Sequence, residues 1–236
     1  MPAPRNKDII SQYPFVPPLT MRVLSINVGG PRQVETRAGP VLTSIFKSPV
    51  QGKVALVRHN LHGDRQSDLR VHGGPYKAVY LYPFEHYTYW SRDLPDADLP
   101  YGAFGENLTT EGLTEDDVHI GDHLRIGSAI LQVTQPRMPC YKLAIRFGRA
   151  DMVKRFWASG HPGVYFSVVQ EGELESGDAI EPLASDPNRV SVGDVVRLFK
   201  GELVDDDLLR RVLKSPLHGS WKKDIQSHLL EGEMVE

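Results

Sequence analysis

The stretch HLRIGSAILQV, residues 123–133, decides the fold class. Two short β-rich runs flank Gly127-Ser128, and a two-residue loop that begins with glycine suits the type II′ turn of a β-hairpin. Gly121-Asp122 precedes the first run, and the same pair recurs at 177–178 before another short β-rich run. Repeated Gly-Asp turns at the starts of short strands favour a barrel over a parallel sheet. We therefore expect a mainly β fold.

The segments around this hairpin predict more short strands and two helices. Strands are expected at residues 21–28, 53–57 and 78–82, each rich in β-branched or aromatic residues. A helix is expected to begin at Pro83 and to continue through residues 84–94, because proline suits the first helical position. A second helix is expected within residues 150–160, where apolar residues share one face and Gly160 can end it.

The C-terminal part is predicted to be helical, with helices expected at 191–200, 205–214 and 219–230. Ser191 and Asp194 have the spacing of a capping box, and Trp221, Ile225 and Leu229 form one apolar stripe. We place a domain boundary near residue 187. The predicted organisation is a flexible N-terminal arm at 1–20, a β domain at 21–187, and a three-helix module at 188–236. The apolar stripes of the module favour a role in covering apolar barrel surface, and the alternative is that it docks the electron donor or a second subunit.

Composition narrows the class of protein. The chain has 236 residues, a formal net charge of −3 and a single cysteine, so charge does not favour a nucleic-acid partner and no intrachain disulfide can form. The first twenty residues contain five prolines and no apolar core of a signal peptide. Since no apolar run approaches the roughly 18 residues of a membrane span, we expect a soluble, cytoplasmic protein without a membrane partner.

The cysteine lies in QPRMPCYKLAIRFG, residues 135–148, directly after the second strand of the hairpin. Arg137 and Lys142 flank Cys140, and nearby positive charges favour the thiolate that binds a soft metal or attacks an electrophile. Pro136 and Pro139 hold this connection in a rigid, irregular path. From these residues alone, the favoured interpretation of Cys140 is a small buried hydrophobe.

A second cluster, HNLHGDRQSDLRVHGGPYKAV, spans residues 59–79 and supports three interpretations. The first is a zinc site, although the spacing matches no common zinc template. The second is an anion-binding loop in which Gly73-Gly74 lets the backbone approach a ligand and His72 and Lys77 supply donors or charge. The third is a glycine turn surrounded by solvated charges. The zinc interpretation uses the side chains of His59, His62, Asp64, Asp68 and His72.

The segment GAFGENLTTEGL, residues 102–113, does not match the dinucleotide-binding pattern, and the chain contains no phosphate-binding GxxxxGK[ST] sequence. Asn107 can hydrogen-bond a heterocycle, or it can serve as a turn residue.

Taken in order, VHGGPYKAVYLYP, GAFGENLTTEGL, IGDHLRIGSAILQVTQPRMPCYKL and GVYFSVVQEGELESGDAI resemble the MOSC family, whose domain is related to the C-terminal part of molybdenum cofactor sulfurase. The resemblance covers about residues 21–182, and the helical tail resembles the three-α module of the YiiM-type branch. It implies a mainly β, pyruvate-kinase-like barrel that binds a molybdopterin cofactor.

The resemblance also implies roles for individual residues. Cys140 would bind molybdenum through sulfur and thereby take part in catalysis, while His72, Lys77 and Asn107 would contact the phosphate and pterin. Asp64 would reach the same site and is a second catalytic candidate. Arg137 and Lys142 are added as cofactor contacts because they lie close to Cys140 in sequence.

The resemblance further implies an oxidoreductase that reduces small N-hydroxylated compounds, such as N-hydroxylated purines. The cofactor carries the difficult step in such enzymes. One cysteine cannot hold an iron–sulfur cluster, so electrons are expected from a separate reductase. The alternatives are a carrier that binds cofactor or sulfur without turnover and a zinc-dependent hydrolase. The sequence is also compatible with a homodimer.

Overall fold

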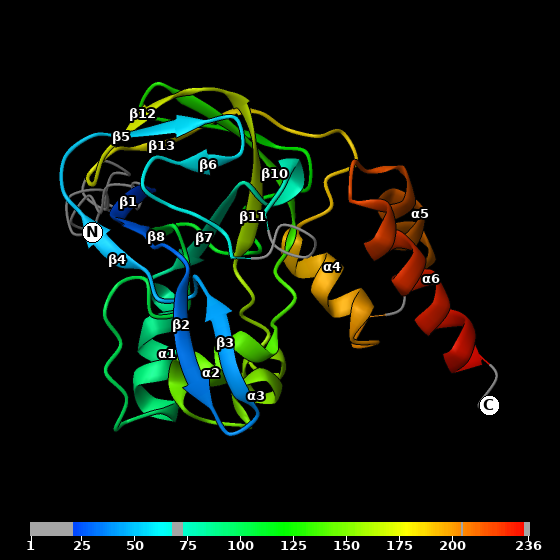
Figure 1. Cartoon of the computed structure of the whole chain (residues 1–236). Coiled ribbons are helices and arrows are strands. Elements are labelled where there is room, and N and C mark those ends of the chain that lie inside the picture. The colour runs from blue at the N-terminus through cyan, green and yellow to red at the C-terminus, as the bar shows by residue number, and fades with distance from the viewer. Residues whose placement is uncertain (1–20, 68–72, 204, 234–236) are drawn as a thin grey trace, which may run out of the picture.

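The computed structural model describes residues 21–67, 73–203 and 205–233, with the side chains of the last helix described to Ser227. An eight-stranded sheet forms its centre, in the order β13-β9-β10-β11-β7-β8-β1-β4 (Figure 1). All neighbouring pairs are antiparallel except β7 and β8, which are parallel. The strands are β1 (Arg22–Val28), β4 (Ser48–Val50), β7 (Val79–Pro83), β8 (Leu108–Glu111), β9 (His123–Ile126), β10 (Ala129–Pro136), β11 (Val164–Gln170) and β13 (Ile180–Ala184).

The predicted hairpin at residues 123–133 is confirmed. Strands β9 and β10 pair antiparallel with Ala129 opposite Ile126, so Gly127 and Ser128 form the connecting loop. Gly127 has a φ of 57°, and Ser128 is not among the described residues with positive φ. A type II′ turn needs positive φ only at its first central residue, so this hairpin fits that type and not type I′.

The expected barrel is only partly closed. Strand β1 meets the start of β13 through an isolated bridge between Arg22 and Ala179. Three backbone hydrogen bonds extend this contact, including one from the Val23 amide to the Asp178 carbonyl at 3.0 Å. The ladder does not continue along either strand, because β4 rather than β13 is the other neighbour of β1. The fold is therefore mainly β with helices, built on a curved sheet in which the start of β13, at one edge, meets β1, the strand next to the other edge.

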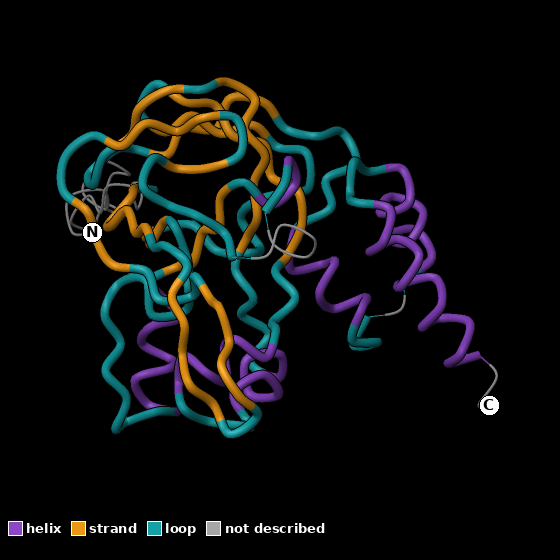
Figure 2. The backbone as a smooth tube through the Cα atoms, in the orientation of Figure 1, coloured by secondary structure: helices purple, strands orange, loops and turns teal. Residues whose placement is uncertain are grey.

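Two smaller sheets complete the β structure. One contains β5 (Val54–Val57), β6 (Asn60–Leu61) and β12 (Gly172–Leu174). The other is the hairpin of β2 (Arg32–Thr36) and β3 (Gly39–Thr43), which extends away from the large sheet and which the sequence patterns did not predict (Figure 2).

Three helices gather at one end of the sheet: α1 (Glu85–Asp93), α2 (Tyr141–Phe147) and α3 (Met152–Ala158) (Figure 1). They enclose an aromatic core in which Trp90, Phe104 and Phe156 are fully buried. The predicted start of the first helix at Pro83 is wrong. Pro83 is the last residue of β7 and pairs with β8, and the helix begins at Glu85.

The C-terminal helices are α4 (Val192–Phe199), α5 (Asp206–Lys214) and α6 (Gly219–Glu233). The predicted capping box of α4 is confirmed, since Ser191 and Asp194 exchange side-chain to backbone hydrogen bonds. Trp221 and Ile225 are buried in the same hydrophobic core as the large sheet, whereas the side chain of Leu229 lies outside the described residues. One core spans sheet and tail, and the domain boundary near residue 187 stays a prediction. Residues 1–20, predicted as an arm, also lie outside the described part.

Among the helices of the described ranges, none combines the length and apolar character that a membrane span requires.

Candidate active site

A pocket opens where several loops and strand ends meet. Four segments contribute to its wall: the loop after β3, the segment after β6, the loop at residues 105–107 before β8 (the GEN loop), and the connection from β10 to α2. The short helix η1 (Pro75–Lys77) forms another part of the wall. The lining residues are Thr43, Ser44, Ile45, Lys47, Arg65, Gln66, Ser67, Gly73, Lys77, Tyr80, Gly105, Asn107, Arg137, Met138, Cys140, Lys142 and Tyr165.

Cys140 lies in the wall of this pocket and is partly buried. Strand β10 ends at Pro136, and α2 begins at Tyr141, so the cysteine is the residue that caps the helix. Its backbone is extended, with φ of −126° and ψ of 167°, and its carbonyl accepts a hydrogen bond from the Leu143 amide at 2.9 Å. Its place at the start of α2 therefore fixes the backbone from which the thiol projects. Helix α2 itself was not predicted from the sequence.

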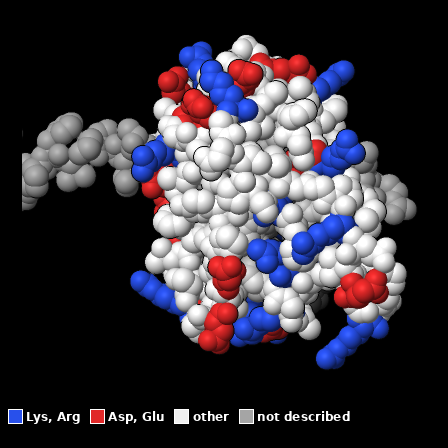
Figure 3. Space-filling view, turned by 60° about the vertical axis from the view of Figure 1, so that its left-hand side comes forward, with Lys and Arg blue, Asp and Glu red and all other residues white. Residues whose placement is uncertain are grey.

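Positive charge surrounds the cysteine. The guanidinium of Arg137 is buried, lies 4.6 Å from the centre of the Tyr80 ring and donates to the Phe104 carbonyl. Lys142 is also buried, and its Nζ donates to Ser67 Oγ at 2.9 Å. Burial lowers the pKa of Lys77, and the neighbouring Cys140 partly offsets that shift. Figure 3 shows basic side chains standing close together on one part of the surface.

Among the residues that the structure describes, the lining contains five cationic side chains, those of Lys47, Arg65, Lys77, Arg137 and Lys142, and no carboxylate. Within the described residues, neither Arg137 nor Lys142 is ion-paired with a carboxylate. Such an excess of desolvated positive charge favours an anionic ligand.

Asp64 lies behind the lining and is itself part of a buried network. Both of its carboxylate oxygens accept hydrogen bonds from Lys47 Nζ, at 2.6 and 2.5 Å. The Gly29 amide donates to Asp64 at 2.8 Å and the Asn107 side-chain amide at 3.0 Å. Burial lowers the pKa of Lys47, and the charge of Asp64 partly offsets the shift. This carboxylate is thus fully engaged inside the protein, and its predicted catalytic role stays a prediction.

Asn107 also binds the protein at both ends of its amide. Its Oδ1 accepts from the Tyr80 backbone amide at 3.1 Å, and its Nδ2 donates to Asp64. The side chain consequently joins β7 to the GEN loop at the floor of the pocket, and its predicted contact with a heterocycle remains untested.

The sequence patterns missed Glu106, the residue that holds the GEN loop in place. Its buried carboxylate accepts from the amides of Gly102 and Phe104, at 2.8 and 3.1 Å, and from two hydroxyl groups. Burial raises its pKa. Gly105 has a φ of 79°, and a Cβ there would lie 2.9 Å from the Ile45 side chain. The GxxGEN pattern is the signal that could have found this loop.

The residues proposed for a zinc site do not come together among the described residues. His59 and His62 are exposed, and with Asp64 they form no group in which a metal ion fits. His72 and Asp68 lie outside the described residues, so the predicted contact of His72 with the cofactor is not tested.

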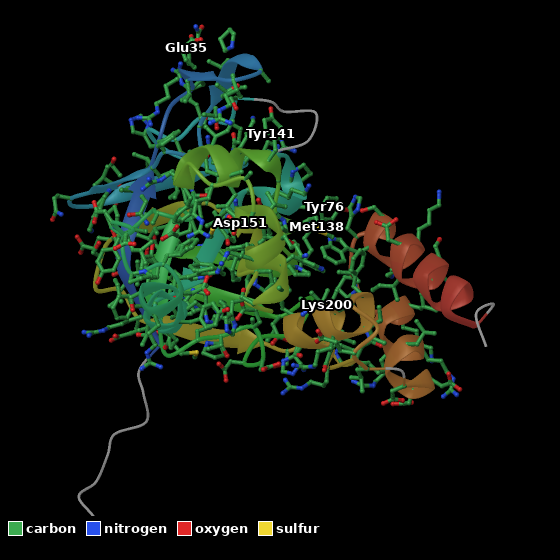
Figure 4. All side chains as sticks on the ribbon, turned by 90° about the horizontal axis from the view of Figure 1, so that it is seen from below. Glu35, Tyr76, Met138, Tyr141, Asp151 and Lys200 are labelled. Carbon is green, nitrogen blue, oxygen red and sulfur yellow. The ribbon has the colours of Figure 1, made fainter. Side chains whose placement is uncertain are left out.

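Three exposed side chains stand beside the pocket: Tyr76, Met138 and Tyr141, exposed by 48%, 46% and 59%. They are chain neighbours of Lys77, Arg137 and Cys140, respectively. The Tyr76 ring meets the His218 ring edge-on, with 4.9 Å between the ring centres. In Figure 4, Tyr76 and Met138 both lie on the side of the β domain that faces the C-terminal helices. The surroundings of the cysteine therefore offer flat and flexible apolar surface next to positive charge.

One buried polar atom in the lining suits a ligand. The hydroxyl of Ser44 has no hydrogen-bond partner among the described residues. A buried hydroxyl without a partner is costly unless a ligand or water satisfies it. Together with the cations and the thiol, it makes a donor set suited to an anion that also carries a soft metal.

Comparison with known proteins assigns this chain to a family. A model of the MOSC domain matches residues 68–181. The protein YiiM of Escherichia coli is 40% identical over 82% of this chain and 88% of its own. The crystal structure of YiiM from Geobacillus stearothermophilus superposes with a TM-score of 0.73 and 35% identity, over 89% of this chain and 99% of the other. A protein of Gibberella moniliformis named "Reductase" is 32% identical over 76% of this chain and 32% of its own.

Proposed function

This chain belongs to the MOSC family, in its YiiM-type branch, and on that basis we propose that it is a molybdenum-cofactor-dependent oxidoreductase acting on small N-hydroxylated compounds. The observation that supports the proposal best is the position of Cys140 in a pocket whose described lining residues include five cations and no carboxylate. The similarity to a fungal reductase favours redox chemistry.

The pocket residues fit the proposed cofactor. In this assignment, Cys140 binds the metal through its thiolate, the soft ligand that molybdenum needs from the protein. Lys77, Arg137 and Lys142 bind the anionic phosphate, since cationic donors form the strongest hydrogen bonds to phosphate. The cofactor supplies the change of oxidation state that removes oxygen from an N–OH group.

The remaining side chains position these groups. Asp64 and Asn107 hold the floor of the pocket, and Glu106 fixes the GEN loop against it. Tyr76, Met138 and Tyr141 lie beside the pocket, where their exposed surfaces suit a flat heterocyclic substrate. The electrons come from a separate reductase in the cytoplasm.

The test is metal and pterin analysis of protein purified from a host that makes the cofactor. We expect near-equal molar amounts of molybdenum and pterin in the unmodified protein and neither in Cys140→Ser. Lys142→Met should weaken cofactor retention by about 10- to 100-fold, the value of a charge-assisted hydrogen bond of 1.5–3 kcal/mol. The matched control is Lys154→Met, which removes an exposed lysine on α3 and should change nothing.

Turnover distinguishes an enzyme from a carrier. Loaded protein supplied with a chemical electron donor should reduce an N-hydroxylated purine, and Cys140→Ser should not. Binding of cofactor without reduction of any N-hydroxylated compound would instead identify a carrier. Failure to bind cofactor even after reconstitution would refute the proposal.

A further inference from the structure

A second group of metal-binding side chains lies outside the pocket. His86 on α1, Glu115 in the loop after β8 and His161 in the loop before β11 each offer one ligand atom, and these atoms lie within 4.8 Å of one another. None of the three lines the pocket. We propose that these residues bind a zinc ion, which fastens the three segments together.

The donor set matches zinc chemistry. Two imidazole nitrogens and one carboxylate oxygen, with a water in the fourth position, form a tetrahedral zinc site of a common kind. His86 Nε2 and Glu115 Oε2 are 2.7 Å apart. Zinc bonds of about 2.0–2.2 Å hold tetrahedral ligands about 3.4 Å apart, so this pair needs to separate by less than about 1 Å to admit the ion.

A second layer of contacts already orients the carboxylate. The other oxygen of Glu115, Oε1, accepts a hydrogen bond from the Gly163 amide at 2.6 Å, which leaves Oε2 directed at His86. Carboxylates that bind a metal are usually held by such a hydrogen bond from an outer partner, which here is the Gly163 amide. The side chains of His86 and Glu115 are nearly buried, while His161 is half-buried and keeps one side of the group accessible.

Besides the small separation of His86 and Glu115, binding requires the His161 ring to change its orientation. The rings of His86 and His161 are stacked, with 4.0 Å between their centres and 18° between their planes. A metal ion lies in the plane of each imidazole that binds it, so the His161 ring must turn. The loop that carries it has Gly160 and Gly163 at positive φ, which lets its backbone take conformations that other residues avoid.

The aromatic rings and charged side chains around these three residues allow a metal ion to bind. Tyr82 and Tyr89 pack edge-on against His86 and His161, respectively, and exclude water from part of the group. The positive charge of Lys200 and the negative charge of Asp116 have opposite electrostatic effects on His161. Lys200 is itself ion-paired with Glu202. No net charge from these neighbours opposes the ion.

The site also touches the pocket wall. Pro162, next to His161, accepts a hydrogen bond from the hydroxyl of Tyr80 at 2.7 Å, and the Tyr80 ring lines the pocket. Zinc binding should therefore stabilise the fold from this side without occupying the cofactor pocket.

The experiment is a zinc titration of metal-free, full-length Cys140→Ser protein against a chromophoric chelator, so that the thiol cannot contribute. We expect about one zinc per chain and a rise in Tm on saturation, because a ligand that binds only the folded state stabilises it. His161→Ala should weaken binding at least about 10-fold and reduce the rise in Tm at the same zinc concentration. The matched control is His59→Ala with His62→Ala, which removes two exposed histidines and should leave both readouts unchanged.

Substitution with cobalt gives a readout independent of stability, since its visible absorption reports nitrogen and oxygen ligands in tetrahedral geometry. Zinc binding that is the same in His161→Ala as in its parent would overturn the proposal. So would the absence of stoichiometric zinc, which would leave His86 and Glu115 as a buried ion pair only.

Discussion

Replacing Asp64 by asparagine should strongly destabilise the protein. The change removes the charged partner of Lys47, whose ammonium is held by both carboxylate oxygens. The Asp64 side chain is 1% exposed and that of Lys47 9%, so solvent cannot replace the lost partner. Breaking such a buried pair costs about 3–5 kcal/mol. For a chain of this length we expect Tm to fall by roughly 10 °C.

The loss should depend on pH in a definite direction. Burial already lowers the pKa of Lys47 in the unmodified protein, and Asp64 works against that shift. Without Asp64 the folded-state pKa drops further, so the variant must hold an unpaired charge or release a proton on folding. The free-energy cost of burying Lys47 without its partner shrinks as the pH rises toward 10.5, the ordinary pKa of lysine. The difference in stability from the unmodified protein should therefore narrow in alkaline solution.

The assay is urea unfolding followed by circular dichroism, at pH 7 and at pH 9. Glu181→Gln is the matched control, because its partner Arg125 is 3.5 Å away and both side chains are about half exposed. That change should cost less than about 1 kcal/mol. Removing both buried charges, with Lys47→Met added to Asp64→Asn, should cost less than Asp64→Asn alone.

Two results would refute this reasoning. One is a loss of stability no greater than that of the Glu181 control. The other is a double variant at least as unstable as Asp64→Asn. Unchanged stability with lost turnover would instead support the catalytic role predicted for Asp64.

Three further effects are expected in the C-terminal helices. Trp221→Ala should lower the free energy of unfolding by about 3–5 kcal/mol, since Trp221 is buried and packs edge-on against Phe199; urea unfolding measures this, and a loss below about 1 kcal/mol would contradict it. Ser191→Ala should cost about 1 kcal/mol through the lost cap of α4, measured by the same method. Burial raises the pKa of Asp194, but bonds from Arg197 and Ser191 outweigh it and lower the pKa overall. The charged Asp194 carboxylate thus stabilises the fold above pH 3.8, and this contribution is lost as the pH falls further. In Asp194→Asn, the free energy of unfolding should therefore fall less steeply at acidic pH than in the unmodified protein, as measured by urea unfolding over a series of pH values.

The sequence by itself determined the structures that depend on local interactions. The hairpin at 123–133 follows from a glycine in a two-residue turn, and the cap of α4 from two residues three positions apart. Strands β1, β5 and β7 and the C-terminal helices follow from short-range patterns of the same kind. The family follows from four motifs in order. The start of α1 was misplaced because Pro83 also suits the end of a strand that pairs with a neighbour far along the chain.

Only the tertiary structure decided which distant residues meet. Cys140, Lys77, Arg137 and Lys142 were predicted in two separate segments, and folding brings them to one pocket with Lys47 and Arg65. The burial of Asp64 beneath that pocket depends on partners 17, 35 and 43 positions away. The same is true of His86, Glu115 and His161, which no spacing connects. Such contacts form because curvature of the sheet and the packing of its loops bring distant segments together. Neither the curvature nor the packing can be predicted from a local sequence pattern.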